Sequence, residues 1–314
     1  MGTGSVSDKV GSPAKRGESQ SLLPVLAAAA SGVLVGSGIV ATRSVVDQAG
    51  PGSIAFMRYL IGFCCLLPPV LLSGRPRFQR RDSLPMALLG IVQFGILVVL
   101  LNYALQFIPS ARAALIFATM PLLTMLFAAA LGSERITVEK TLGVMLTILG
   151  VGFALGEKAI QRGGTGGEWV GEAAAFASAL SGAVCSVLYR PYLRRYPTLP
   201  VSAFAMFAAV CFLSILAARE GYFAAAPAFT LTGWLAILFI GVNSGAGYYL
   251  WLWALSHTTP TRVTVFLALS PITAALLGPV FLDESLSTVL LAGLVLVALG
   301  LWLAHRQPSK RIAP

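Results

Sequence analysis

Long apolar stretches follow one another along the chain, separated by short polar segments. Spanning a bilayer takes ~20 consecutive, mostly apolar residues. A segment in lipid must satisfy its own backbone hydrogen bonds, so each such stretch is predicted to be a helix. The fold class is therefore an all-α integral membrane protein. Ten windows carry this pattern: 22–40, 54–72, 84–105, 111–131, 138–155, 169–189, 202–218, 231–254, 261–282 and 288–304.

Composition strengthens the membrane assignment. Apolar residues make up 57% of the chain and charged residues 11%, against about 25% charged residues in soluble proteins. The net charge of +10 could indicate a nucleic-acid ligand, but the basic residues are distributed by side. If the N-terminus is cytoplasmic, 16 of the 22 Lys and Arg residues fall on the inner side. Because positive charge collects on the cytoplasmic side of membrane proteins, both termini are predicted to be cytoplasmic and no nucleic-acid partner is expected.

The cysteines do not form a disulfide or metal-binding pattern. All four fall inside predicted spans, where they pack as small hydrophobic residues, so no metal and no cofactor is expected. Residues 1–20 are polar and are predicted to form a disordered cytoplasmic tail, and residues 306–314 form a second cytoplasmic tail. The first apolar run has no convincing processing site, so no cleavable signal peptide is predicted. The cysteines are Cys64, Cys65, Cys185 and Cys211.

The chain repeats itself at a shift of 150 residues. Segment 103–155 aligns with 253–305 without a gap, and 12 of the 53 positions are identical. Each half, 21–156 and 168–305, then holds five spans, joined by an outer linker at 157–167. Because five is odd, the second half enters the membrane inverted, an architecture that recurs in transporters. The informative identities are Arg112 with Arg262, Pro121 with Pro271, Glu134 with Glu284, Gly143 with Gly293 and Gly150 with Gly300.

Three segments resemble a known transporter family. LGSERITVEKTLGVMLTILGVG at 131–152, FLDESLSTVLLAGLVLVALG at 281–300 and AFMRYLIGF at 55–63 are similar to the EamA family of the drug/metabolite transporter superfamily. The resemblance implies ten helices in two inverted five-helix repeats, a bacterial inner-membrane location, and export of amino acids or small metabolites. Aromatic amino acid exporters of the YddG type are similar in length and layout. One departure is Val35 before Gly36, where many members carry a Trp-Gly pair.

Two amides inside spans are the main candidates for solute binding. Gln93 and Asn243 match at the 150-residue shift, and a buried amide needs hydrogen-bond partners. The repeat favours a shared central site, and the alternative is an interhelix hydrogen bond. Tyr248 lies one turn plus one residue beyond Asn243, and its ring could bound the same cavity. Weaker candidates of the same kind are Asn102, Ser37 and Ser181.

Other residues are assigned to helix ends and bends. Trp251 and Trp253 are interpreted as part of an interfacial aromatic belt. Proline removes a helical hydrogen bond and kinks the helix, so Pro121 and Pro271 are either hinges for gating or static kinks. Glu134 and Glu284 are assigned a structural role at helix ends, each followed three residues later by a possible N-cap, Thr137 or Ser287.

Absent residues narrow the function. No Asp, Glu or Lys lies in the middle of a predicted span, and proton-coupled carriers commonly use such a carboxylate. The site should then prefer a neutral or zwitterionic solute, without obligatory proton coupling. The leading hypothesis is a secondary carrier that exports amino acids, including aromatic ones, or similar metabolites by alternating access. The alternatives are a drug-efflux carrier of the same fold, an intramembrane enzyme and a membrane scaffold. The sequence lacks the motifs expected of an intramembrane enzyme. The oligomeric state stays open.

Overall fold

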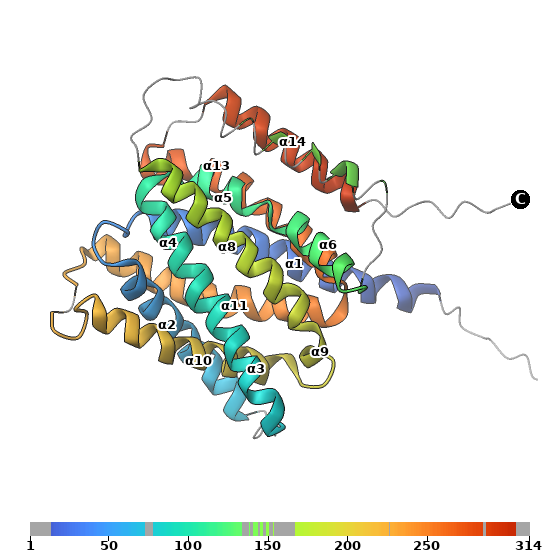
Figure 1. The fold of residues 1–314 in the computed structure, drawn as a ribbon, viewed down its shortest axis with the longest axis horizontal. Coiled ribbons are helices and arrows are strands. Elements are labelled where there is room, and N and C mark those ends of the chain that lie inside the picture. Colours follow the sequence, from blue (N-terminus) through green and yellow to red (C-terminus); the bar gives the residue numbers. More distant parts are fainter. Residues whose placement is uncertain are drawn as a thin grey trace, which may run out of the picture.

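The computed structural model describes residues 14–72, 78–133, 167–225, 227–284 and 287–305, with isolated positions between 138 and 153. Within these residues the secondary structure is helical, without strands (Figure 1). The helices are α1 (Ala14–Arg43), α2 (Pro51–Leu72), α3 (Arg80–Gly90), the π-helix η1 (Ile91–Ile96), α4 (Leu97–Phe107), α5 (Ser110–Phe117), α6 (Met120–Ala130), α8 (Glu168–Leu188), α9 (Arg190–Leu193), α10 (Thr198–Arg219), α11 (Leu231–His257), α12 (Pro260–Val265), the 3₁₀ helix η2 (Phe266–Ala268), α13 (Leu269–Leu282) and α14 (Thr288–His305).

Eight segments of the described chain are long and apolar enough to cross a membrane. They agree with the first four predicted spans and with the sixth to the ninth. The tenth window contains α14, whose apolar part, Thr288–Gly300, is shorter. Much of the fifth window, the predicted linker apart from its last residue, and most of both tails lie outside the described residues. An integral membrane protein is thus supported, and the count of ten helices stays a prediction.

The helices of the two sequence halves pack against each other rather than forming two separate bundles. Helix α1 packs on α11 and α13, α8 packs on α4 and α6, and α2 packs on α10 and α11, while α14 lies at the edge (Figure 1). Small residues permit a close crossing between α2 and α11. A Cβ added at Gly62 would lie 3.2 Å from the Gly241 carbonyl oxygen, and one at Gly245 would lie 3.0 Å from the Gly62 oxygen. Close backbone approach at small residues is how membrane helices associate.

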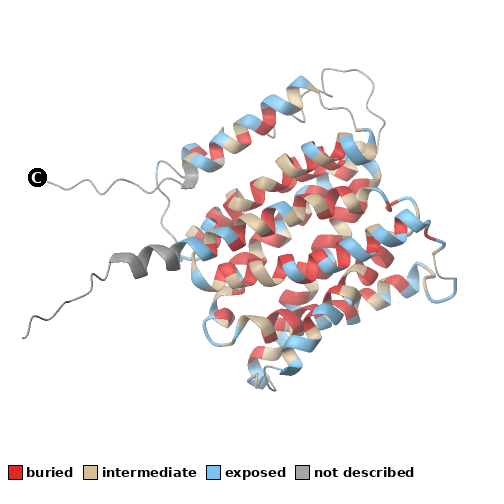
Figure 2. Ribbon diagram, turned by 180° about the vertical axis from the view of Figure 1, so that it is seen from behind, coloured by how far each residue is buried: buried red, intermediate tan, exposed pale blue. Residues whose placement is uncertain are grey.

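The outer surface of the bundle is apolar. Exposed residues lie along the outer faces of the helices, while the buried ones face inward (Figure 2). Many exposed side chains are large and apolar, which in water would be an extensive unfavourable surface. A lipid-facing surface accounts for them. Examples are Leu26, Leu88, Leu235, Phe239, Leu276 and Val280.

Two carboxylates from the second half cap helices of the first half. Glu220, just after α10, accepts hydrogen bonds from the backbone amides of Gly52 and Ser53 at 2.8 and 2.7 Å, at the start of α2. Glu284 accepts one from the amide of Ser110 at 3.0 Å and another from its hydroxyl, at the start of α5. A carboxylate is stabilised at a helix N-terminus, so each cap also joins the halves.

The expected helix-end roles can be compared with these contacts. Ser287 accepts a hydrogen bond from the Leu290 amide at 3.0 Å, as an N-cap of α14 does. Glu284 does not fix only its own loop, because it accepts a hydrogen bond from Ser110, which lies in the other half of the chain. Its repeat equivalent, Glu134, and Thr137 lie outside the described residues.

Both predicted proline bends coincide with interruptions of a span. The fourth span changes from α5 to α6 just before Pro121, and the ninth passes through the 3₁₀ segment η2 just before Pro271. Proline lacks the amide that would donate to the carbonyl four residues earlier, which here belongs to Phe117 or Leu267. The interruptions therefore lie at matching positions of the two halves, while a kink or a hinge at either proline stays a prediction.

Candidate functional site

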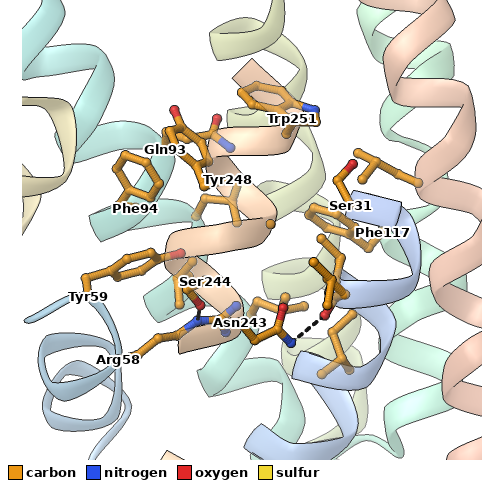
Figure 3. A pocket seen from close by; sticks show the side chains of 18 of the residues that line it. Ser31, Arg58, Tyr59, Gln93, Phe94, Phe117, Asn243, Ser244, Tyr248 and Trp251 are labelled. Atoms are coloured by element: carbon orange, nitrogen blue, oxygen red, sulfur yellow. Dashed lines mark hydrogen bonds between the residues drawn. The ribbon is translucent and has the colours of Figure 1, made fainter. Parts of the chain in front are cut away.

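A cavity of about 90 Å³ lies among α1, α2, η1, α4, α5, α6, α11 and η2 (Figure 3). Residues of both sequence halves line it, and its wall is mostly apolar with a few polar groups, as in most small-molecule sites. The polar and aromatic lining residues carry the chemistry discussed below. They are Ser31, Arg58, Tyr59, Gln93, Phe94, Phe117, Asn243, Ser244, Tyr248 and Trp251.

The two amides predicted from the repeat both reach this cavity, with different surroundings. Asn243 donates hydrogen bonds from Nδ2 to the Leu34 carbonyl at 2.8 Å and to Ser37 Oγ at 3.3 Å, which joins α11 to α1. Gln93 lies in the π-helix η1 and is 9% exposed, and its buried Oε1 has no hydrogen-bond partner among the described residues. A buried acceptor without a partner is costly, so Gln93 is available to a ligand that can donate.

Arg58 is the main candidate site residue that the sequence analysis did not single out. It is the eighth residue of α2, about 10 Å along the helix at ~1.5 Å per residue, and it faces the cavity (Figure 3). Its Nε donates to Ser244 Oγ, and that hydroxyl in turn donates to the Ile240 carbonyl. A Cβ added at Gly38 would lie 3.4 Å from Asn243 Nδ2 and 3.5 Å from Arg58 Nη2. The guanidinium and the amide therefore lie close together beside that glycine.

The guanidinium of Arg58 has no carboxylate partner in the described part of the chain. No Asp or Glu is among the residues that line the cavity. A charged residue within a span is costly and usually marks a functional site. The sequence carries a signal for this residue, since Arg58 is the single charged residue of window 54–72.

Aromatic rings form one continuous wall of the cavity. The ring centroids of Tyr59 and Phe94 are 4.9 Å apart, those of Phe94 and Tyr248 3.9 Å, and those of Tyr248 and Trp251 5.4 Å. The expectation for Tyr248 as a cavity wall fits this arrangement. Edge and tilted contacts of this kind are the favoured geometries of aromatic pairs. The wall offers a flat, polarisable surface to an apolar or aromatic group.

The belt interpretation of Trp251 is wrong. Trp251 is 4% exposed and lines the cavity, and its indole nitrogen has no hydrogen-bond partner among the described residues. The reason is the length of α11, which continues six residues further and places Trp251 on the same helix face as Tyr248 and Ser244. Trp253 instead stacks on His257 near the helix end, with ring centroids 4.3 Å apart.

The three weaker candidates do not line the cavity. Ser37 contacts it indirectly, through Asn243. Asn102 is fully buried and donates from Nδ2 to the Pro51 carbonyl at 3.0 Å, so it holds α4 against the start of α2. Ser181 donates to the Ala177 carbonyl of its own helix at 2.9 Å. Their bonds are intramolecular, and their roles in solute binding stay predictions.

No candidate metal site is found among the described residues. They contain no group of three His, Cys, Asp or Glu side chains placed to hold a metal ion. The cavity therefore presents a cation, amides and aromatic faces, which can bind a solute reversibly.

Comparisons with known proteins find relatives that cover most of the chain. The chain is 28% identical to the probable terminal-alkyne amino-acid exporter of Streptantibioticus cattleyicolor, covering 88% of this chain and 91% of that protein. It is also 28% identical to the uncharacterized inner membrane transporter YedA of Escherichia coli, covering 91% and 94%. A solved crystal structure shares the fold with a TM-score of 0.68 and 22% identity, over 92% of this chain and 97% of that one.

The family assignment follows from the profile of the EamA-like transporter family. It matches the chain twice, over residues 22–156 and 169–306, which are close to the two halves found by internal comparison. Proteins similar to this chain over most of its length are named as transporters. The chain thus belongs to the EamA-like transporter family and is a membrane transporter rather than an enzyme.

Proposed function

We propose that this protein is a secondary carrier that exports amino acids across the inner membrane by alternating access, and that the cavity around Arg58 holds the solute. The observation that carries the proposal is an arginine without a carboxylate partner in the described chain, set in a cavity of amides and aromatic rings. The amino-acid exporter of Streptantibioticus cattleyicolor, similar over most of the chain, supports the same class of solute.

The cavity offers complementary groups to each part of an amino acid. The α-carboxylate would accept hydrogen bonds from the Arg58 guanidinium, which binds planar carboxylates well. The ammonium group would donate to Gln93 Oε1, which has no partner in the described structure. The side chain would pack on the wall of Phe94, Tyr248 and Trp251. A cationic drug finds no counter-ion among the residues that line the cavity, so the drug-efflux alternative is less well supported.

Transport is proposed to run without obligatory proton coupling. Arg58 is the one ionisable group besides two tyrosines among the cavity-lining residues, and none of these residues is a carboxylate of the kind that proton-coupled carriers commonly use. The carrier would then move solute down its own gradient. Bending at Pro121 and Pro271, at matching places in the two halves, would open the cavity to either side in turn.

Counterflow in proteoliposomes tests the binding mode. Vesicles loaded with unlabelled phenylalanine should accumulate labelled phenylalanine transiently, and phenylalanine should compete better than phenylalaninamide, which lacks the carboxylate. One charge-assisted hydrogen bond contributes about 1.5–3 kcal/mol, so the amide should compete at least about tenfold less well. Equal competition by phenylalaninamide would refute the proposed role of Arg58. If none of the twenty amino acids gives counterflow, the proposed solute class is refuted.

A second measurement tests the coupling. At equal pH and zero membrane potential, downhill flux of the labelled amino acid should proceed. Imposing a pH gradient should not raise the internal solute above equilibrium. If the unchanged protein accumulates solute uphill under this gradient and the Glu284→Gln variant does not, the Glu284 carboxylate couples transport to protons.

A further inference from the structure

We propose that a second site, separate from the solute cavity, binds the phosphate of an anionic phospholipid headgroup. It is a pocket of about 370 Å³ where α9, the end of α11 and the start of α12 meet. This basic pocket is defined by Arg190, Arg194, Arg262, His257, Thr258 and Thr259. The proposal does not depend on which solute the carrier transports.

The charges of the basic pocket are not balanced within the described chain. Arg190, Arg194 and Arg262 converge on one pocket, and none forms an ion pair with another described residue. Like charges gathered at one place repel each other. An arrangement of this kind is stabilised when an anion occupies it. Dispersed arginines would satisfy the inner-side bias of charge equally well, so that bias does not explain their convergence.

The internal repeat supplies a comparison for Arg262. Its equivalent, Arg112, lies at the start of α5 and pairs with Glu168 at 3.2 Å and Glu172 at 3.7 Å, both from α8. Arg262 lies at the same place in the second half, but its neighbours in the pocket are two further arginines. In the first half, the charge of Arg112 is thus balanced by two glutamates of the same chain. Arg262 is exposed and has no such carboxylate partner among the described residues, so an external anion can reach it.

The rest of the pocket suits a phosphate group. The hydroxyl groups of Thr258 and Thr259 add donors beside the guanidinium groups. His257 is held in place, because its Nδ1 lies 2.8 Å from the Trp253 carbonyl oxygen and 2.9 Å from Ser256 Oγ while its ring stacks on Trp253. An arginine guanidinium can donate two parallel hydrogen bonds to a phosphate group. Because His257 is already held in place, less entropy is lost when a ligand binds beside it.

The position of the basic pocket favours a lipid over free phosphate. Helix α9 and the beginning of α1 lie at the same end of the bundle (Figure 1), which is the cytoplasmic end on the predicted topology. Leu188, two residues before Arg190, is exposed on the apolar outer surface. Acyl chains could thus lie beside a phosphate held by the arginines. Basic pockets between helices on the cytoplasmic side bind anionic headgroups.

The test measures lipid binding to the full-length protein in detergent. Phosphatidylglycerol adducts would be counted by native mass spectrometry, with phosphatidylcholine and inorganic phosphate as the other two ligands. Phosphatidylglycerol should bind at least about tenfold more tightly than either. Arg262→Gln and the double variant Arg190→Gln/Arg194→Gln should each weaken it at least about tenfold, the size expected for a lost charge-assisted hydrogen bond.

A matched control separates a site from diffuse attraction. Arg80→Gln/Arg81→Gln removes two exposed charges at the same predicted end, outside the basic pocket, and should leave lipid binding unchanged. An equal loss in this control would overturn the proposal, as would binding of inorganic phosphate that matches the lipid. If a glutamine variant does not fold, Arg190→Lys/Arg194→Lys keeps the charge and should still weaken binding. Full binding by that lysine variant together with Arg262→Lys would contradict specific phosphate recognition.

Discussion

Gln93 and Asn243 stand at repeat-related positions, yet they meet the cavity differently. Asn243 lies in a regular α-helix, uses its Nδ2 to hold α1, and has Arg58 beside it. Gln93 lies in a π-helix and leaves its Oε1 without a partner in the described structure. One side of the cavity thus presents donors and the other an acceptor. A symmetric scaffold has become a polar site with two unlike sides, which suits a solute with an anionic and a cationic group.

Removing the positive charge on the donor side should have the largest effect. Arg58→Gln is expected to reduce counterflow of the amino acid at least about 100-fold, because two charge-assisted hydrogen bonds to the carboxylate are lost. Arg58→Lys should retain part of the activity, since it keeps the charge without the planar fork. Initial rates in proteoliposomes measure this effect. Unaltered transport by Arg58→Gln would show that the cavity has no donor side that binds the solute carboxylate.

Asn243→Ala should affect both transport and stability. The variant loses the hydrogen bonds to Leu34 and Ser37, and an interhelix bond in a membrane protein contributes roughly 0.6–2 kcal/mol. We expect a lower unfolding temperature in detergent and at least about tenfold slower counterflow. A variant that is destabilised but transports normally would show that Asn243 serves packing alone.

Gln93→Met should affect transport without loss of stability. Methionine has a similar shape, and the replaced Oε1 has no partner in the described structure, so the unfolding temperature should stay the same or rise. The apparent affinity for the amino acid should fall about tenfold, because the ammonium group loses its acceptor. A marked drop in stability would indicate that Gln93 is engaged by the protein after all.

Ser37→Ala should give the smallest effect of the series. Its contact with Asn243 Nδ2 is long, at 3.3 Å, and Asn243 keeps its bond to the Leu34 carbonyl. The expected change in transport affinity is less than about threefold, below the tenfold that corresponds to about 1.4 kcal/mol. An effect as large as that of Asn243→Ala would place Ser37 among the residues that bind the solute directly.

The repeat spacing was enough to predict which two amides share a cavity, because equivalent positions in two interlocked halves come together at the centre. Arg58 could not be found in this way, since the 150-residue shift pairs it with Ala208. Nor could the pattern separate Trp251 from Trp253, which lie two residues apart in one apolar window. Only the observed length and rotation of α11 does so. Asn102 shows a further limit, because its partner, the Pro51 carbonyl, is 51 residues away.

The π-helix around Gln93 has an evolutionary consequence. A π turn contains one residue more than an α turn, so a single-codon deletion within Ile91–Ile96 could restore a regular helix. The residues on one side of the deletion would then rotate by about 100° relative to those on the other, which would change whether Gln93 or a neighbouring side chain faces the solute. Selectivity in this lineage could therefore shift through a one-residue insertion or deletion in the third span, with no substitution at any cavity residue.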